Sequence, residues 1–317
     1  MRRAGHRGRA GTVERHPYDR RRLDALVAYA EAHRPSAYVN LPVRRLLTDL
    51  ASPEGVIELR MGGRTALVGA VVDKCENLHD AALLEVLGID ADAAPAPLLA
   101  AAAAIGRSVA RSAGRPRLSL ALPVPLDAAL AGLDGWTPAE GSYVMERDLA
   151  PWPSPALPPG GAWEDLAVER VGEHYETIRA AFAADPGMLL PDLATFAAAS
   201  LASDPPVRVL RVAGAEVGFA RVSFEEGGRV GYVATIGRSP AWRGGGLGPV
   251  VLAEALRVLA RRKVERFRLG VTATNTAAVG LYERAGFRIA ETWRTWRQPV
   301  DARVPVRSGE PDAMEAR

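Results

Sequence analysis

A short glycine-rich segment in the second half of the chain has the residue types that bind a phosphate group. Arg243 is followed by three glycines and then by Leu247 and Gly248, and an apolar-periodic segment at 250–262 comes directly afterwards. Glycine lets the backbone approach a ligand closely and adopts dihedral angles that other residues avoid. The N–H groups and the positive dipole at a helix N-terminus attract an anion. The segment therefore predicts a site for a phosphate-bearing ligand.

The spacing of this segment separates it from the commoner nucleotide-binding motifs. Residues 243–248 fit R-x-x-G-x-G, and they fit neither G-x-G-x-x-G nor G-x-x-x-x-G-K-[ST]. A second segment downstream, residues 275–287, reads N-T-A-A-V-G-L-Y-E-R-A-G-F. Together the two segments resemble the GNAT acetyltransferase superfamily in order and in spacing.

The resemblance implies an acetyl-CoA site with a role for individual residues. Residues 243–248 would hold the pyrophosphate, and the end of the strand at 232–237 would separate from its neighbour and bond the pantetheine. Asn275 would meet the pantetheine arm, and Tyr282 would protonate the departing thiolate as general acid. The cofactor-binding residues implied in this way are Ile236, Gly237, Arg238, Arg243, Gly244, Gly245, Gly246, Leu247, Gly248, Asn275, Ala278 and Tyr282.

Each of these features also has a purely structural interpretation. A glycine run before a helix is often only a tight turn, and a tyrosine on a helix is more often a half-buried packing residue than an acid. The presence of both segments at the family's spacing favours the acyl-CoA site. One position departs from the family pattern, since Arg238 stands where an apolar residue is usual. Its side chain either faces solvent or adds charge beside the phosphates.

Direct transfer of an acyl group from a thioester to an amine places three demands on such a site. A base must take the amine proton, N–H groups must stabilise the oxyanion, and an acid must protonate the thiolate. Backbone N–H groups near Ile236 and the Tyr282 hydroxyl meet the second and third demands. Glu225, at the end of a bordering strand, is the tentative base, with Glu226 and Asp192 as alternatives. For each carboxylate an ordinary surface role is the commoner one.

Composition limits the classes of protein that remain. The chain has 317 residues, of which 48% are hydrophobic, and a net charge of +3. A single cysteine, Cys75, excludes a disulfide framework and a cysteine-rich metal site, and the 5 histidines show no ligand spacing. No run of about 18 apolar residues exists, so we expect no membrane span. From the cysteine and histidine content we expect no bound metal. The simplest interpretation is a cytoplasmic enzyme.

The N-terminal residues 1–22 are strongly basic, with eight arginines against Glu14 and Asp19. Such a tail contacts nucleic acid or an anionic surface in some proteins. Its Gly/Arg composition is more typical of a solvated, flexible leader. We therefore expect no nucleic-acid and no membrane partner.

Hydrophobic periodicity predicts an alternation of helices and strands along the chain. The helices are expected at 20–33, 43–50, 97–113, 127–133, 172–184, 191–202, 250–262 and 276–285. The strands are expected at 56–60, 65–72, 81–87, 118–122, 142–148, 163–169, 207–212, 216–224, 231–236, 266–273 and 287–297.

The second half of the chain repeats the plan of the first. Gly69 and Gly218, each after a valine in a predicted hairpin, lie 149 positions apart, and Gly135 and Gly286, each before an aromatic residue, lie 151 apart. Offsets that agree this closely indicate duplication of one domain. Residues 151–161 are too rich in proline and glycine for a helix or a central strand, so they separate the halves.

The predicted fold is therefore a mixed α/β sheet with helices on both faces, built from two tandem GNAT-like domains of which the first is degenerate. The resulting divisions are a basic flexible tail at 1–19, a degenerate GNAT-like domain at 20–150, a linker at 151–161, an acetyl-CoA-binding GNAT domain at 162–300 and a flexible tail at 301–317. The plan is similar to that of tandem GNAT enzymes of the mycothiol synthase type, and it is too widespread to imply their acceptor.

The first half lacks the residues of the phosphate site. The segment that corresponds to the glycine turn begins at Gly88 and has no further glycine. Asp90 and Asp92 would repel a pyrophosphate, and Pro95 and Pro97 remove backbone donors. We therefore expect this half not to bind acyl-CoA, and either to shape the acceptor pocket or simply to pack against the second half.

The sequence thus predicts an acetyltransferase that uses acetyl-CoA and acts on a primary amine of a small molecule or a peptide N-terminus. The alternative is a non-catalytic acyl-CoA-binding regulatory or interaction module. The two differ in a simple observation, because a regulator would bind acetyl-CoA and leave it intact. The acceptor and the oligomeric state stay open at this stage.

Overall fold

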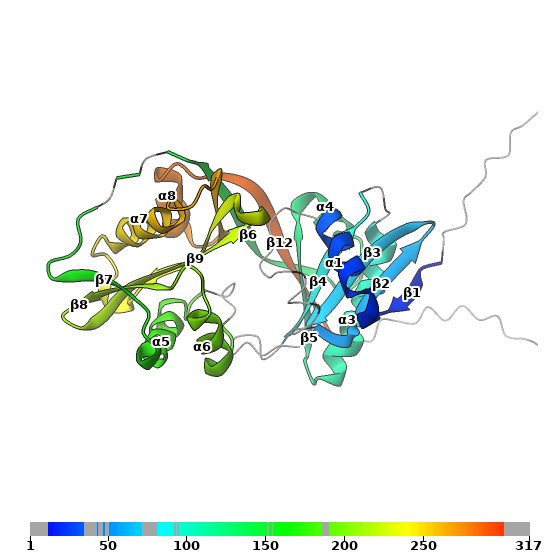
Figure 1. Ribbon diagram of the computed structural model, residues 1–317. Coiled ribbons are helices and arrows are strands. Elements are labelled where there is room, and N and C mark those ends of the chain that lie inside the picture. Colours follow the sequence, from blue (N-terminus) through cyan, green and yellow to red (C-terminus); the bar gives the residue numbers. More distant parts are fainter. Residues whose placement is uncertain are drawn as a thin grey trace, which may run out of the picture.

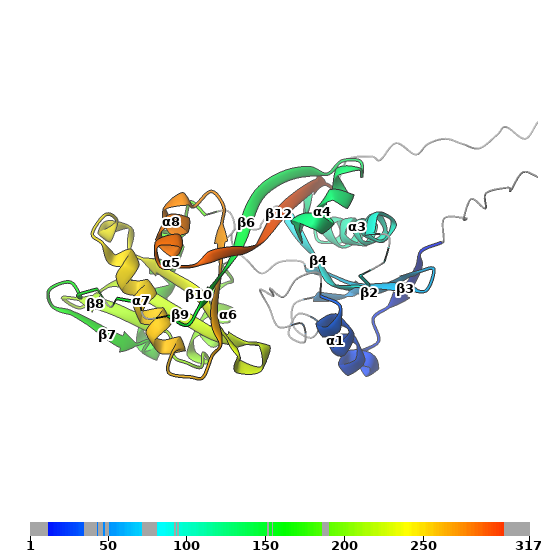
Figure 2. The same cartoon turned by 90° about the horizontal axis from the view of Figure 1, so that it is seen from above.

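The computed structural model describes residues 12–34, 43, 47, 51–71, 81–91, 93, 95–150, 152–153, 155–185 and 190–300. Its centre is a twelve-stranded mixed sheet in the order β1-β2-β3-β4-β5-β12-β6-β11-β10-β9-β8-β7. Helices cover both faces of this sheet, and two lobes meet where β6 and β12 run side by side (Figures 1 and 2). The predicted mixed α/β fold is confirmed.

The strands of the two halves follow in the same order, and of the helices given below α6 alone has no described counterpart in the other half. In the first half the elements are β1 (Glu14–Pro17), α1 (Leu23–Ala32), β2 (Ala51–Met61), β3 (Arg64–Val71), β4 (Ala81–Ile89), α3 (Pro95–Ser112), β5 (Arg117–Pro123), α4 (Val124–Ala131) and β6 (Thr137–Asp148). In the second half they are β7 (Gly161–Asp165), α5 (Val171–Ala181), α6 (Leu193–Leu201), β8 (Arg208–Val212), β9 (Ala215–Glu225), β10 (Val230–Arg238), α7 (Leu247–Leu259), β11 (Arg266–Thr272), α8 (Thr276–Arg284) and β12 (Arg288–Pro299).

The last strand of each half is exchanged into the sheet of the other half. β6 of the first half pairs with β11 of the second, and β12 of the second half pairs with β5 of the first. The side chains follow the strands, since Met145 of β6 lies in the core around α7 and Trp296 of β12 lies in the core around α3. Each fully buried large apolar side chain of this kind contributes roughly 1.5–3 kcal/mol. Each core is therefore completed by the other half.

α3 and α7, the longest described helix of each half, begin differently. α3 starts with Pro95, which a first helical turn tolerates because its N–H groups have no intrahelical partner. α7 starts at Leu247, three residues before the helix expected from the sequence, because Gly246 adopts a left-handed conformation (φ 73°) directly before it. The proline at 249 lies in the first turn and does not interrupt it.

Several boundaries differ from the sequence predictions. Glu14–Pro17, expected in a flexible tail, form β1 and pair with β2, so that part of the prediction is wrong. The strand expected at 163–169 ends at Asp165, and the helix expected at 172–184 ends at Ala181. The tail at 301–317, Cys75 and most of the helix expected at 43–50 lie outside the described residues. Among the helices that the structure describes, none has the length and apolar character needed to cross a membrane.

Candidate active site

A cavity of about 550 Å³ opens between the end of β10, the start of α7, α8 and the segment after α5. Every cofactor-binding residue implied by the sequence except Gly245 lies on its wall. The same wall includes Leu281 of the second family segment, and residues to which the sequence analysis gave no role in the site: Phe182, Asp185, Thr272 and Arg284.

The cavity exists because two neighbouring parallel strands separate. β10 and β11 pair from Val230↔Arg266 to Val233↔Leu269, and their pairing ends there although both strands continue. A register shift between Val233 and Thr235 marks the same point on the other edge of β10. The edge of β10 that faces the gap beyond Val233 therefore presents backbone groups to the cavity instead of to β11. This is the separation that the family resemblance implied.

The glycine turn presents the N-terminus of α7 to the cavity. Gly244 and Gly246 have φ values of 81° and 73°, which other residues rarely adopt. No described side chain caps α7, and its first turn contains no acidic residue. The first N–H groups of a helix lack intrahelical partners, so in this turn they remain donors for a bound anion.

Two arginines, Arg238 and Arg243, line the cavity together with the glycine turn. Arg238 lies on the wall, and a Cβ placed on Gly248 would be 3.9 Å from its Nη1. Of the two orientations left open by the sequence, the structure has the one beside the predicted phosphate site. Arg243 also lines the cavity, and its Nη2 donates to the carbonyl of Ala181 at 3.3 Å. The two guanidinium groups add positive charge to that of the α7 dipole.

Asn275 has a structural role in addition to its place on the wall. Its side-chain oxygen accepts a hydrogen bond from the backbone N–H of Ala278 at 3.3 Å, which caps α8. Asparagine is among the preferred residues at this position. The cap fixes the helix that carries Tyr282.

Tyr282, predicted to be the proton donor, is a buried residue of α8. Only 8% of the residue is exposed, and its ring packs edge-on against Phe287 with the ring centroids 6.0 Å apart. Burial, assisted by the negative charge of Asp185, raises the pKa of Tyr282 to about 12. The hydroxyl therefore keeps its proton at neutral pH and can donate it.

Asp185 and Thr272 form a polar contact at the mouth of the separated strands. The Thr272 hydroxyl donates to Asp185 Oδ1 at 2.9 Å. Asp185 follows the end of α5, where its N–H donates to the carbonyl of Phe182 at 2.9 Å. No motif in the sequence points to this aspartate, since its position depends on how α5 meets the end of β11.

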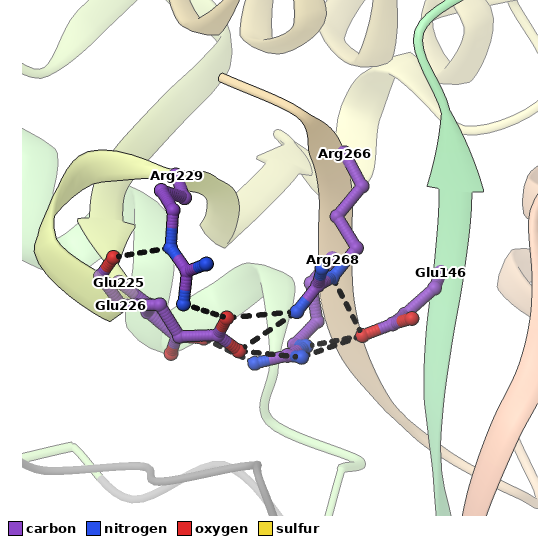
Figure 3. Close-up of polar contacts among 6 residues, drawn as sticks. All are labelled: Glu146, Glu225, Glu226, Arg229, Arg266 and Arg268. Atoms are coloured by element: carbon purple, nitrogen blue, oxygen red, sulfur yellow. Dashed lines mark hydrogen bonds and ion pairs between the residues drawn. The ribbon is translucent and has the colours of Figure 1, made fainter.

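Glu225, the tentative base, does not line this cavity. It belongs to the ion-pair cluster drawn in Figure 3, which joins β6, the end of β9 and β11. Arg268, only 2% exposed, lies at the centre of the cluster, and its Nη1 is 2.9 Å from Glu225 Oε2. Burial raises the pKa of Glu225, and the Arg268 charge opposes that rise. The other members are Glu146, Glu226, Arg229 and Arg266.

The two alternative bases, Glu226 and Asp192, also interact with residues outside the cavity. Glu226 pairs with Arg266 at 2.8 Å, and Asp192 accepts from the Thr195 N–H at 2.9 Å as the cap of α6. Neither lines the cavity. The base role of Glu225 stays a prediction, and a different carboxylate faces the cavity.

The wall residues together fit acetyl-CoA. An uncapped helix N-terminus with neighbouring arginines suits a diphosphate, and an unpaired strand edge suits the amide groups of a pantetheine arm. A buried, protonated tyrosine in the same wall suits a thiolate leaving group. Among the described residues, no group of histidine, cysteine and carboxylate side chains could hold a metal ion.

Comparison with known sequences gives the same family as the motifs. Residues 175–287 match the family model described as Acetyltransferase (GNAT) family. The mycothiol acetyltransferase of Salinispora arenicola is 34% identical over 210 residues, which is 58% of this chain and 64% of that protein. The mycothiol acetyltransferase of Salinispora tropica is 34% identical over 182 residues, which is 51% of this chain and 56% of that protein. The matches thus span less than two thirds of these relatives' length.

Solved structures show that the tandem fold is shared over most of the chain. A GCN5-related N-acetyltransferase from Sphaerobacter thermophilus superposes with a TM-score of 0.71 at 18% identity, covering 91% of this chain and 96% of that one. A tandem GNAT protein from the clavulanic acid biosynthesis pathway gives a TM-score of 0.65 at 15% identity, covering 91% and 99%. At these identities the likeness concerns the fold alone.

Proposed function

We propose that the protein transfers an acetyl group from acetyl-CoA directly to a primary amine, because residues 175–287 match the family model of the GNAT acetyltransferases. The observation that carries the proposal is one cavity with an uncapped helix N-terminus at one end and the protonated Tyr282 in its wall. The relatives are named mycothiol acetyltransferases, which supports a small molecule over a peptide N-terminus as acceptor. A cytoplasmic location is part of the proposal.

The chain's own residues would divide the work as follows. Residues 243–248, with Arg238, hold the diphosphate through N–H groups and charge. The unpaired edge of β10 orients the pantetheine arm, and N–H groups near Ile236 stabilise the oxyanion. Acetyl-CoA supplies an activated acetyl thioester. Tyr282 holds a proton at its hydroxyl for the departing sulfur.

Binding is tested by calorimetry with acetyl-CoA on the wild type and on Gly246→Glu. The substitution puts a carboxylate and a Cβ at a left-handed position beside the phosphate site, so we expect it to abolish binding. Gly214→Glu is the matched control, because Gly214 has a similar φ of 81° in the β8–β9 turn and does not line the cavity. A wild type that does not bind acetyl-CoA would refute the proposal.

Catalysis is tested by thiol release when acetyl-CoA is mixed with a panel of primary amines. Tyr282→Phe should bind acetyl-CoA like the wild type and lose about 10²-fold or more in kcat, the usual contribution of a positioned acid. Binding without consumption of acetyl-CoA by any amine would indicate the non-catalytic module instead.

A further inference from the structure

Among the described residues that line the cavity, Asp185 is the one with a carboxylate side chain. The remaining ionisable residues of the wall are Arg238, Arg243, Arg284 and Tyr282. Three of these are cations, and two of the cations flank the glycine turn. The single negative charge of the wall thus comes from the segment after α5 and not from the phosphate-binding turn.

Asp185 lies close to the proposed point of transfer. Asp185 and Tyr282 line the same cavity, and the charge of Asp185 contributes to the raised pKa of Tyr282. Asp185 also accepts a hydrogen bond from Thr272, the last residue of β11, which borders the gap between the separated strands. The Thr272 contact fixes the carboxylate in one orientation while the residue remains partly exposed toward the cavity.

A carboxylate beside a leaving-group acid has a defined use in an amine acetyltransferase. Primary amines are protonated at neutral pH, and an ammonium ion is held by a carboxylate through a charge-assisted hydrogen bond. The same carboxylate can accept the proton that must leave before nitrogen attacks. Thr272 keeps its own hydrogen bond on Oδ1, and a carboxylate has about four acceptor sites in all.

Resting on the proposed function, we propose that Asp185 binds the ammonium group of the acceptor and takes its proton. The proton passes from nitrogen to a carboxylate oxygen, and the freed lone pair forms the C–N bond to the acetyl carbon. The C–S bond breaks with its electron pair on sulfur, and sulfur takes the proton of Tyr282. The nitrogen, which after C–N bond formation still carries one proton more than the amide, passes it to the Tyr282 phenolate through water, and Asp185 releases its proton to solvent. The site accordingly selects acceptors that are cationic at neutral pH.

The test uses two small amines that differ in charge. Ethanolamine is cationic at neutral pH and needs a base, whereas methoxyamine is neutral there and needs none before attack. Asp185→Asn keeps the size of the side chain and can still accept from Thr272. We expect it to lower kcat/KM for ethanolamine by about 10²-fold, the usual contribution of a positioned base, and to leave methoxyamine nearly unchanged.

Two further variants complete the design. Glu176→Gln is the matched control, because Glu176 lies on α5, is 58% exposed and does not line the cavity. It should change neither rate. Glu225→Gln separates the two candidate bases, since a loss confined to ethanolamine in this variant and not in Asp185→Asn would overturn the proposal.

The remaining outcomes are also decisive. Equal losses for both amines in Asp185→Asn, or no loss for ethanolamine, would overturn the role of Asp185. A wild type that binds acetyl-CoA and acetylates neither amine would overturn it as well, because the carboxylate would then not capture a small ammonium ion. Failure of the proposed function is recognised separately, by the absence of acetyl-CoA binding in calorimetry.

Discussion

The two halves share a backbone plan and differ in the side chains placed on it. In the first half β4 and β5 pair in parallel as far as Leu84↔Leu120, and in the second half β10 and β11 pair as far as Val233↔Leu269. Both end points are related by the same offset of 149 positions found in the sequence. Separation of the two parallel strands is therefore a property of the fold and does not by itself make a site.

The two halves differ in the segment that follows the separated strand, which is β4 in the first half and β10 in the second. In the first half Asp90 occupies this segment, with its carboxylate bonded to the Tyr29 hydroxyl at 2.9 Å and to the Thr65 N–H at 2.8 Å. In the second half the segment is the glycine turn, and no described side chain caps the first N–H groups of α7. At the offset of 151 that relates Gly286 to Gly135, Ala131 stands where the second half has Tyr282. The first half therefore has a carboxylate where the second half has the predicted anion site. It has an aliphatic side chain where the second half has the tyrosine.

The largest effect is expected when the two halves are separated. Residues 162–300 alone lack β6, so β11 would lose its partner from Arg266↔Asp148 to Thr272↔Ser142 and expose an apolar edge. We expect this fragment to aggregate, and to become soluble when it is co-expressed with residues 1–161. Size-exclusion chromatography and circular dichroism measure both. A folded, monomeric 162–300 fragment that binds acetyl-CoA would show that the exchange is dispensable.

The next largest effect is expected from replacing Arg268. The first half has Ser119 at the corresponding position of β5, so serine is the substitution that tests the difference. Arg268→Ser removes the buried cation that Glu146 and Glu225 share, and leaves their charges uncompensated. We expect a loss of about 3–5 kcal/mol in the free energy of unfolding, measured with urea. Arg266→Ser is the control, since its side chain is 31% exposed and should cost about 1 kcal/mol or less. Equal losses would contradict a special role for the buried cation.

The sequence predicted the phosphate end of the site better than its acceptor end. The glycine turn and Tyr282 lie in two short segments whose chemistry depends on local spacing, and both segments reach the cavity. Asp185 has no local signature, because α5 packs against β9 and β10, and this packing brings the segment after α5 to the end of β11. Glu225 was chosen as a strand-end carboxylate, and its partner Arg268 comes from a strand that local sequence does not link to it.

The fold shows the same limit. The alternation that predicts β6 and β12 is identical whichever strand lies beside them, so the exchange between halves leaves no trace in the local pattern. β1 was missed because Glu14–Pro17 contain charges and end in proline, a composition that only an edge strand tolerates. Local patterns thus predicted most elements, and tertiary pairing decided which strands meet.

The smallest effect concerns Glu85, which stands in β4 where the second half has Ala234 at the offset of 149. Burial raises the pKa of Glu85 from its usual value of 4.5 to about 7. Between these two values the folded state holds a proton that the unfolded chain has lost. Stability therefore falls as pH rises through this window and levels off above it.

A glutamine at position 85 cannot ionise, so Glu85→Gln removes this loss of stability with rising pH. Above the window we expect the variant to exceed the wild type by about 1–3 kcal/mol in the free energy of unfolding, and below it the two should show the same pH dependence. Urea unfolding across the window measures the difference, with the exposed Glu176→Gln as control. Parallel curves would mean that Glu85 is charged in the folded protein. The strand gap of the first half would then hold an ionised carboxylate, and the contrast with Ala234 would be one of charge as well as size.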